Sequence, residues 1–188
     1  MNRKSTPQLR MEVARETFLE RNWPTSGDLP LSWGASEEDR AELTSKLRRE
    51  KRLFGVWSPR QGAYIYPTFQ FLRENPALQQ ALLPAVPALL ATLESIPGFS
   101  DSEMDVAGGD PGRWRRLFWL YQPRSELSER SLAETALQKS GMSALESVVA
   151  TDGVNESPRA PADVFSEVPD AVIELACRDA AEDRKGDF

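Results

Sequence analysis

The side chains that could do chemistry in this chain are mostly charged groups suited to binding. Histidine is absent and Cys177 is the only cysteine, so the commonest general base and the commonest transition-metal ligand are both missing. Acid pairs such as Glu37–Glu38 lie in strongly charged segments, where a solvated helix face explains them without acid–base catalysis. The only glycine pair, Gly108–Gly109, lacks the Lys-Ser/Thr that completes a phosphate-binding loop. We therefore expect a protein that is not an enzyme and needs neither a metal nor a cofactor.

Cations gather toward the end of one predicted helix. Ser36 is a suitable N-cap, and the acidic residues at 37–39 favour the positive end of the helix dipole. We expect this helix to run to about residue 52. Its cations, with one from the turn that follows, are the candidate DNA contacts: Arg40, Lys46, Arg48, Arg49, Lys51, Arg52 and Arg60. Lysine and arginine bind phosphates without reading base sequence, but cations in a last helical turn also complement the dipole by roughly 0.3–1 kcal/mol each without DNA.

The net charge of −6 is unevenly distributed. Residues 1–73 contain 13 Lys/Arg and 9 Asp/Glu, which gives +4, whereas residues 74–188 contain 10 and 20, which gives −10. Such segregation is typical of a nucleic-acid contact at one end and a protein contact at the other. An ordinary solvated surface is the alternative, because nucleic-acid-binding surfaces are usually more basic than this.

The elements that must position the cations have the order of a winged helix-turn-helix. An amphipathic helix is predicted at residues 8–21, and Pro24 and Pro30 restrict the next segment to a short, broken helix. After the cationic helix, two short apolar runs flank a turn containing Pro and Gly, which is the pattern of a β-hairpin. This module is expected to span residues 1–72.

The densest aromatic run, "YIYPTFQF" at 64–71, follows the hairpin turn. Pro67 is expected to end the hairpin at an edge, because proline cannot donate to a strand ladder. Gln70 is then available to satisfy backbone groups where the strand stops.

Residues 73–188 are predicted to be helical, so that the fold class is mainly α with one two-stranded β-hairpin. The apolar face at 78–93 is interrupted by Pro84 and Pro87, which favours a kink or two short helices, and it belongs to the core or to a homodimer interface. Further helices are expected at about 114–121, at 128–149 with a break at Gly141, and from about Asp170 onward with Cys177 on the apolar face. No run approaches transmembrane length, and no apolar segment follows the charged N-terminus. We therefore expect a soluble, cytoplasmic protein that does not enter a membrane.

Three blocks of the chain carry a family resemblance: "RLFGVWSPRQGAYIYPTFQF" at 52–71, "DPGRWRRLFWLYQP" at 110–123, and "RAPADVFSEVPDAVIELACRDAAEDRKGDF" at 159–188. Together they resemble the domain shared by the Xre, MbcA and ParS antitoxins. The most specific match is to the family's Y-P-x-F-Q-F block, here Tyr66, Pro67, Phe69, Gln70 and Phe71. Weaker matches follow in the expected order at Trp114, Trp119, Leu120, Arg159, Pro161, Phe165, Val172, Ala176, Asp187 and Phe188.

The resemblance implies a protein-binding function. Antitoxins of this family occupy the NAD-binding cleft of a RES-type or related ADP-ribosyltransferase-like toxin with their carboxy-terminal end, and many repress their own operon. On that analogy the candidate partner contacts are Arg178, Asp179, Asp187 and Phe188. A terminal aromatic ring and a carboxylate could fill a nucleotide pocket and meet its cations, although chain ends are also commonly frayed.

Two departures from the family pattern are visible. Residues 124–157 intervene where the family has a few residues, and are expected to form an insertion or an expanded loop. The amino-terminal module lacks the several helices of an Xre-type repressor. We expect an antitoxin-like regulator that neutralises a toxin and binds operator DNA; the alternative is a dimeric adaptor or a free-standing transcriptional regulator without a toxin partner.

Overall fold

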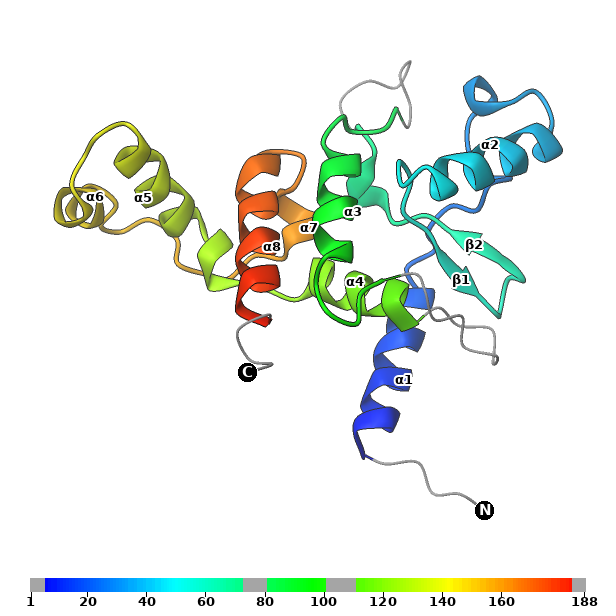
Figure 1. Cartoon of the computed structure of the whole chain (residues 1–188), viewed down its shortest axis with the longest axis horizontal. Helices are drawn as coiled ribbons and strands as arrows, with labels where there is room; N and C mark the ends of the chain where they lie inside the picture. Colours follow the sequence, from blue (N-terminus) through cyan, green and yellow to red (C-terminus); the bar gives the residue numbers. More distant parts are fainter. Residues whose placement is uncertain (1–5, 73–80, 101–110, 184–188) are drawn as a thin grey trace.

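The computed structural model describes residues 6–72, 81–100 and 111–183. Figure 1 shows a mainly helical molecule with one small β-hairpin, which confirms the predicted fold class. The helices α3, α4, α7 and α8 form the centre. The hairpin and α2 lie at one end of the long axis, and α5 and α6 lie at the other.

The amino-terminal part begins with α1 (Thr6–Leu19), η1 (Leu31–Trp33) and α2 (Glu37–Arg49). The predicted N-cap of α2 is confirmed: Ser36 accepts a hydrogen bond from the backbone N–H of Asp39, whose carboxylate accepts one from the Ser36 N–H. A 3₁₀ turn, rather than a full helix, directly precedes α2. The carboxyl end of α1 instead contacts α4, where Phe18 lies 5.3 Å from Tyr121 between ring centroids.

The predicted hairpin is present as β1 (Val56–Ser58) and antiparallel β2 (Ala63–Ile65). Val56 and Ile65 pair in register and are both buried in the main core, whereas Trp57 and Tyr64 make an edge-to-face contact on the other side. The hairpin ends before Pro67, after which the chain turns into η2 (Thr68–Gln70). One face of the strands is therefore buried in the main core, and the turn at residues 59–62 is exposed (Figure 1).

Gln70 has the structural role predicted for it. Its side chain is fully buried, and its amide donates to the carbonyls of Phe54 and Pro67 at 2.8 and 2.9 Å. Its Oε1 accepts the backbone N–H of Phe54 at 2.7 Å. One amide thus satisfies three backbone groups where β-pairing has stopped, which explains a buried polar residue between two phenylalanines.

The main core lies between α3 (Val86–Glu94), α4 (Pro111–Tyr121), α7 (Pro161–Val164) and α8 (Pro169–Asp183). Helix α3 packs along α8. The core is built from these helices and also from the hairpin: its buried members include Val86, Leu89, Leu93, Leu117, Leu120, Phe165, Val172, Leu175, Phe54, Val56, Ile65 and Phe69. A smaller cluster under α2 comprises Leu29, Leu47, Leu53, Tyr66 and Phe71. Residues from both sides of the predicted boundary at 72–73 therefore share one core.

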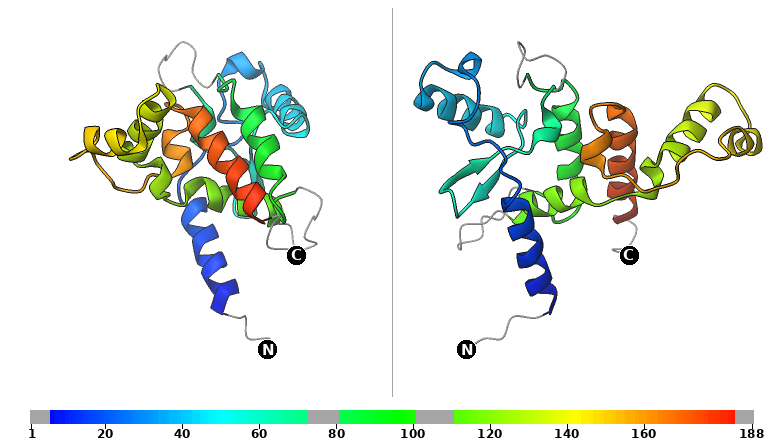
Figure 2. Two further views of the ribbon diagram at one scale, coloured as in Figure 1. Left: turned by 60° about the vertical axis from the view of Figure 1, so that its left-hand side comes forward. Right: turned by 180° about the vertical axis from the view of Figure 1, so that it is seen from behind.

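The predicted insertion is a helical hairpin, formed by α5 (Glu129–Lys139) and α6 (Ala144–Ala150) after the short turn η4 (Ser125–Leu127). Figures 1 and 2 show it projecting from the body of the molecule beyond α8. The chain leaves and returns at one place, because Arg124 and Arg159 exchange backbone hydrogen bonds of 2.9 and 3.2 Å. The break predicted at Gly141 is confirmed by its φ of +101°, which favours glycine. We call residues 128–157 the insertion hairpin.

Some details differ from the sequence-based expectations. Helix α2 ends at Arg49 rather than near residue 52, because Lys51 adopts the left-handed conformation with φ of +56°. The prediction that Cys177 lies on the apolar face of the last helix is wrong: its side chain is exposed, while Val172 and Ala176 are buried as expected. Within the described residues, no helix is both long enough and apolar enough to cross a membrane.

Candidate functional site

Two of the predicted DNA contacts, Arg40 and Arg48, turn toward the protein. The Arg40 guanidinium donates to the backbone carbonyls of Ser26, Gly27 and Gly34 at 3.3, 3.2 and 3.0 Å. It therefore fixes the segment that leads into α2 rather than extending into solvent. Arg40 therefore has a structural role in this fold, and its contact with DNA stays a prediction.

Arg48 is occupied by the tyrosines of the hairpin. Its guanidinium carbon lies 3.8 Å from the centroid of the Tyr64 ring, and its Nη1 donates to the hydroxyl of Tyr66. Burial raises the pKa of Tyr66 above its ordinary value, so that the hydroxyl stays neutral beside the cation. This stacked arrangement anchors α2 on β2. Arg48 therefore has a structural role, and its contact with DNA stays a prediction.

The remaining five candidates are exposed, and we call them the α2 cation surface: Lys46, Arg49, Lys51, Arg52 and Arg60. Four of them lie near carboxylates. Lys46 and Arg52 lie 4.0 and 3.7 Å from the Glu50 carboxylate. Lys51 forms an ion pair with Glu94. Arg60 forms one with Glu16 at 2.7 Å. Arg49 makes no ion pair with the part of the chain that the structure describes. Exposed pairs of this kind are weak, so that phosphates could replace the carboxylates.

Arg113 also contacts Tyr64, the tyrosine on which Arg48 stacks, and the sequence did not predict this contact. Its guanidinium lies 5.8 Å from the Tyr64 ring centroid and donates to the Gly55 carbonyl at 3.3 Å. It comes from α4, 58 residues away from Gly55, and no local sequence signal connects two residues so far apart.

Asp179, a predicted partner contact, holds helices together inside the molecule. Its Oδ2 accepts hydrogen bonds from the Trp119 indole N–H and from Arg124 Nη2, both at 2.6 Å. The Arg124 guanidinium also lies 5.8 Å from the Trp119 ring centroid. Asp179 thereby joins α8 to the end of α4 and to the base of the insertion hairpin. It has a positioning role in this fold, and its contact with a partner stays a prediction.

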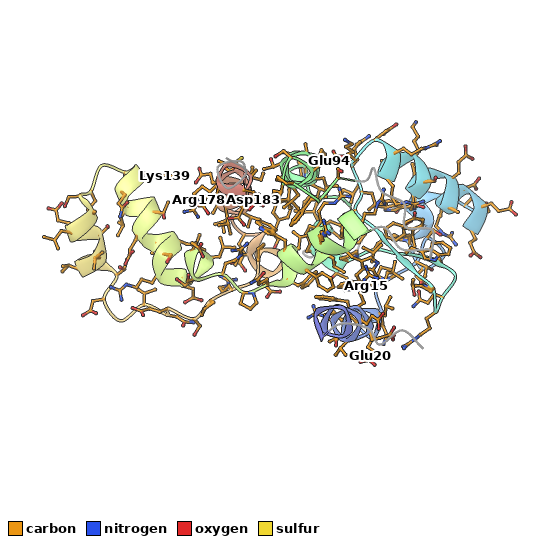
Figure 3. The ribbon with its side chains drawn as sticks, turned by 60° about the horizontal axis from the view of Figure 1, so that its bottom comes forward. Arg15, Glu20, Glu94, Lys139, Arg178 and Asp183 are labelled. Atoms are coloured by element: carbon orange, nitrogen blue, oxygen red, sulfur yellow. The ribbon has the colours of Figure 1, made fainter. Side chains whose placement is uncertain are left out.

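Arg178 lines a groove of about 400 Å³ between α8 and the base of the insertion hairpin. We call it the α8 groove; its lining residues are Glu126, Leu127, Leu132, Thr135, Ala171, Ile173, Glu174, Cys177 and Arg178. Figure 3 shows Lys139 on α5 and Arg178 on α8 at this side of the molecule. Lys139 Nζ pairs with Glu174 at 2.7 Å and so connects α5 to α8 beside the groove.

The α8 groove combines an apolar floor with a charged rim. Leu127 is buried, and Leu132 and Ile173 are half-buried against the main core. At the rim, the pKa of Glu126 is held below its ordinary value, chiefly by a hydrogen bond to its own backbone and also by the charges of Arg124 and Arg178. The groove is therefore suited to an apolar group flanked by polar or charged groups. The insertion residues of this groove gave no signal in the sequence, because they meet α8 only in the fold.

The other two predicted partner contacts, Asp187 and Phe188, lie outside the described residues. Within residues 6–72, 81–100 and 111–183, no group of three or more His, Cys, Asp or Glu side chains could hold a metal ion. Comparison of the chain with protein-family models, with curated proteins and with solved structures found no match. The function must therefore be argued from the two surfaces and the sequence resemblance.

Proposed function

We propose that this chain is an antitoxin-like regulatory protein that binds a toxin partner at the α8 groove and DNA through the α2 cation surface. The observation that carries the proposal is the groove itself. It lies along the helix that the antitoxin resemblance assigns to partner binding, and it contains the predicted contact Arg178.

The chemistry of the groove favours a protein segment as its occupant. A volume of about 400 Å³ holds one or two large side chains, and interfaces derive most of their energy from such anchors seated in apolar pockets. Arg178 and Glu126 at the rim would select polar groups beside the anchor. The carboxylate of Asp179, next to Arg178 in the sequence, fixes α8 through its bonds with Trp119 and Arg124.

DNA contact is assigned to the other end of the long axis. The α2 cation surface places exposed cations on α2 and on the hairpin turn, as a phosphate-binding surface requires. Arg40 and Arg48 support the geometry of this module, and contacts to phosphates are expected without contacts to base edges.

Reciprocal charge reversals test the proposal. The full chain and its Arg178→Glu and Arg49→Glu variants are each co-expressed with the protein encoded by the neighbouring reading frame, and growth, co-purification and binding to upstream DNA are measured. Arg178→Glu is expected to weaken partner binding at least tenfold and to leave DNA binding intact; Arg49→Glu should do the reverse.

Each exposed substitution serves as the matched control for the other, because both reverse one charge on a helix surface. Partner binding that survives Arg178→Glu would contradict the assignment of the groove. If the neighbouring protein is neither toxic nor bound, the toxin proposal fails, and DNA binding alone would favour the free-standing regulator.

A further inference from the structure

The insertion hairpin holds polar side chains between its two helices and exposes the aliphatic side chains of α6. Helix α5 has no buried residue, and Ser147 is the only buried residue of α6. The two helices are joined by polar contacts: Gln138 Nε2 donates to Ser147 Oγ and the Thr151 hydroxyl donates to Glu134, each at 3.0 Å. This is the reverse of the usual arrangement, in which helices bury an apolar stripe against each other.

The outward face of α6 carries a contiguous aliphatic stripe. Leu145, Val148 and Val149 are 76%, 41% and 69% exposed. They are three of the five large hydrophobic side chains that are exposed among the described residues. Positions three and four apart share one helix face, and we call these three residues the α6 stripe. Such clustering marks an interaction site, whereas single exposed aliphatics do not.

Acidic groups border the α6 stripe. Glu146 is three residues before Val149 within α6. Asp152 lies just beyond the end of the helix, where its backbone N–H donates to the Val149 carbonyl at 3.3 Å. The two cations of the insertion hairpin are already engaged, Arg130 with Glu134 and Glu156, and Lys139 with Glu174. The border of the stripe therefore has a negative charge that the described part of the hairpin does not neutralise.

We propose that the α6 stripe docks a cationic amphipathic segment of another protein, with an apolar face that covers the stripe and lysine or arginine side chains that meet Glu146 and Asp152. Charge disfavours a second copy of this chain as the occupant, because two stripes packed together would bring like charges side by side.

The test uses a fluorescently labelled helical peptide of leucine and lysine, with the lysines along both borders of its leucine face. Its binding to the full chain is measured by anisotropy, beside that of a peptide in which glutamate replaces lysine. We expect the lysine peptide to bind, the glutamate peptide not to bind, and Leu145→Ser with Val149→Ser to weaken binding at least tenfold. Glu146→Gln with Asp152→Asn should weaken binding and reduce its salt dependence.

Val13→Ser is the matched control, since Val13 is 67% exposed on α1 and lies outside the stripe; this variant should bind like the unmodified chain. All these substitutions are at exposed positions, and circular dichroism checks that the fold is retained. The proposal is overturned if the lysine peptide does not bind, if the stripe and Val13 variants bind equally, or if both peptides bind alike. A dimer in sedimentation velocity that the stripe variant abolishes would identify a second copy as the occupant and would also overturn it.

Discussion

At the scale of single residues, several polar and charged side chains bind other groups of the protein itself. Arg40 binds three carbonyls, and Gln70 binds three backbone groups in the core. Asp179 fixes two helices through Trp119 and Arg124. The presence of a polar residue indicates only that its side chain needs a hydrogen-bond partner. In this fold that partner is often the protein's own backbone.

Replacing Gln70 with leucine should destabilise the molecule strongly. The leucine would leave the Phe54 N–H without its side-chain partner, and the carbonyls of Phe54 and Pro67 would each lose a hydrogen bond. An unsatisfied buried group costs about 1–3 kcal/mol, so that we expect a loss of about 2–5 kcal/mol in all. Urea unfolding followed by fluorescence measures this loss. Gln61→Leu, at an exposed position in the hairpin turn, is the control and should change stability by less than about 0.5 kcal/mol. An equal effect of the two substitutions would refute the buried-amide interpretation.

At the scale of elements, the insertion hairpin is built as a separable unit. Its base is closed by the Arg124–Arg159 backbone pair. The two chain segments meet again at Arg130, whose N–H donates to the Asn155 carbonyl at 3.1 Å. A short turn could therefore connect residues 130 and 155 directly.

Excision of residues 131–154, with two or three glycines in their place, should leave a cooperatively folded molecule. Most side chains removed are exposed, and the main core keeps Leu127, Phe165 and Val172. We expect the melting temperature to change by only a few degrees, whereas loss of a core element would abolish the transition. Differential scanning calorimetry of the two proteins makes the comparison, and a broad or absent transition would show that the hairpin is required for folding.

Acid should loosen the insertion hairpin before the core. The pKa of Glu134 is held below its ordinary 4.5 by hydrogen bonds from Arg130 and Thr151, and that of Glu146 by hydrogen bonds from Ser143. Since each folded-state pKa is lowered, the stabilisation is complete above 4.5 and is lost as the pH falls through the folded value. Amide NMR signals of α5 and α6 should shift during this acidification while those of α3 and α8 remain. A Glu134→Gln variant should show a smaller pH response, and simultaneous loss of all signals would contradict the prediction.

The sequence predicted elements better than it predicted contacts between them. The N-cap at Ser36, the hairpin before Pro67 and the break at Gly141 are local, because capping, proline chemistry and glycine backbone freedom act over a few residues. The α8 groove and the Arg113–Tyr64 contact join segments that are far apart in the chain, so that no local sequence motif predicts them. Arg48 illustrates the same limit: its charge was evident, but its stacking on Tyr64 was not.

At the scale of the whole molecule, the two proposed binding activities are separated along the long axis. Figure 1 shows α2 and the hairpin at one end and the insertion hairpin at the other, with the α8 groove near the base of the latter. The excess of cations lies in residues 1–73, which include α2 and the hairpin, and the excess of acidic residues lies in residues 74–188. A DNA-bound molecule would thus present its groove away from the duplex, so that both partners could be bound at once.

The salt dependence of DNA binding should reveal how many cations take part. If all five members of the α2 cation surface contact phosphates, the slope of log K against log salt should be roughly −4 to −5. Arg49→Gln is expected to reduce the magnitude of that slope by about one, and gel-shift titrations at several salt concentrations measure it. Arg178→Gln removes a cation at the other end and should leave the slope unchanged. A slope near zero for the unmodified chain would mean that these cations are exposed to solvent and make no contacts with phosphates.

The position of Cys177 has a practical consequence for kinetics. Because the chain contains one cysteine, and its thiol is exposed in the wall of the α8 groove, the rate at which a coloured thiol reagent reacts with the unmodified protein reports whether the groove is open. A bound partner segment should slow that reaction in proportion to occupancy, while DNA at the distant α2 cation surface should not. The molecule therefore carries an intrinsic reporter by which partner binding can be timed without a label or a substitution.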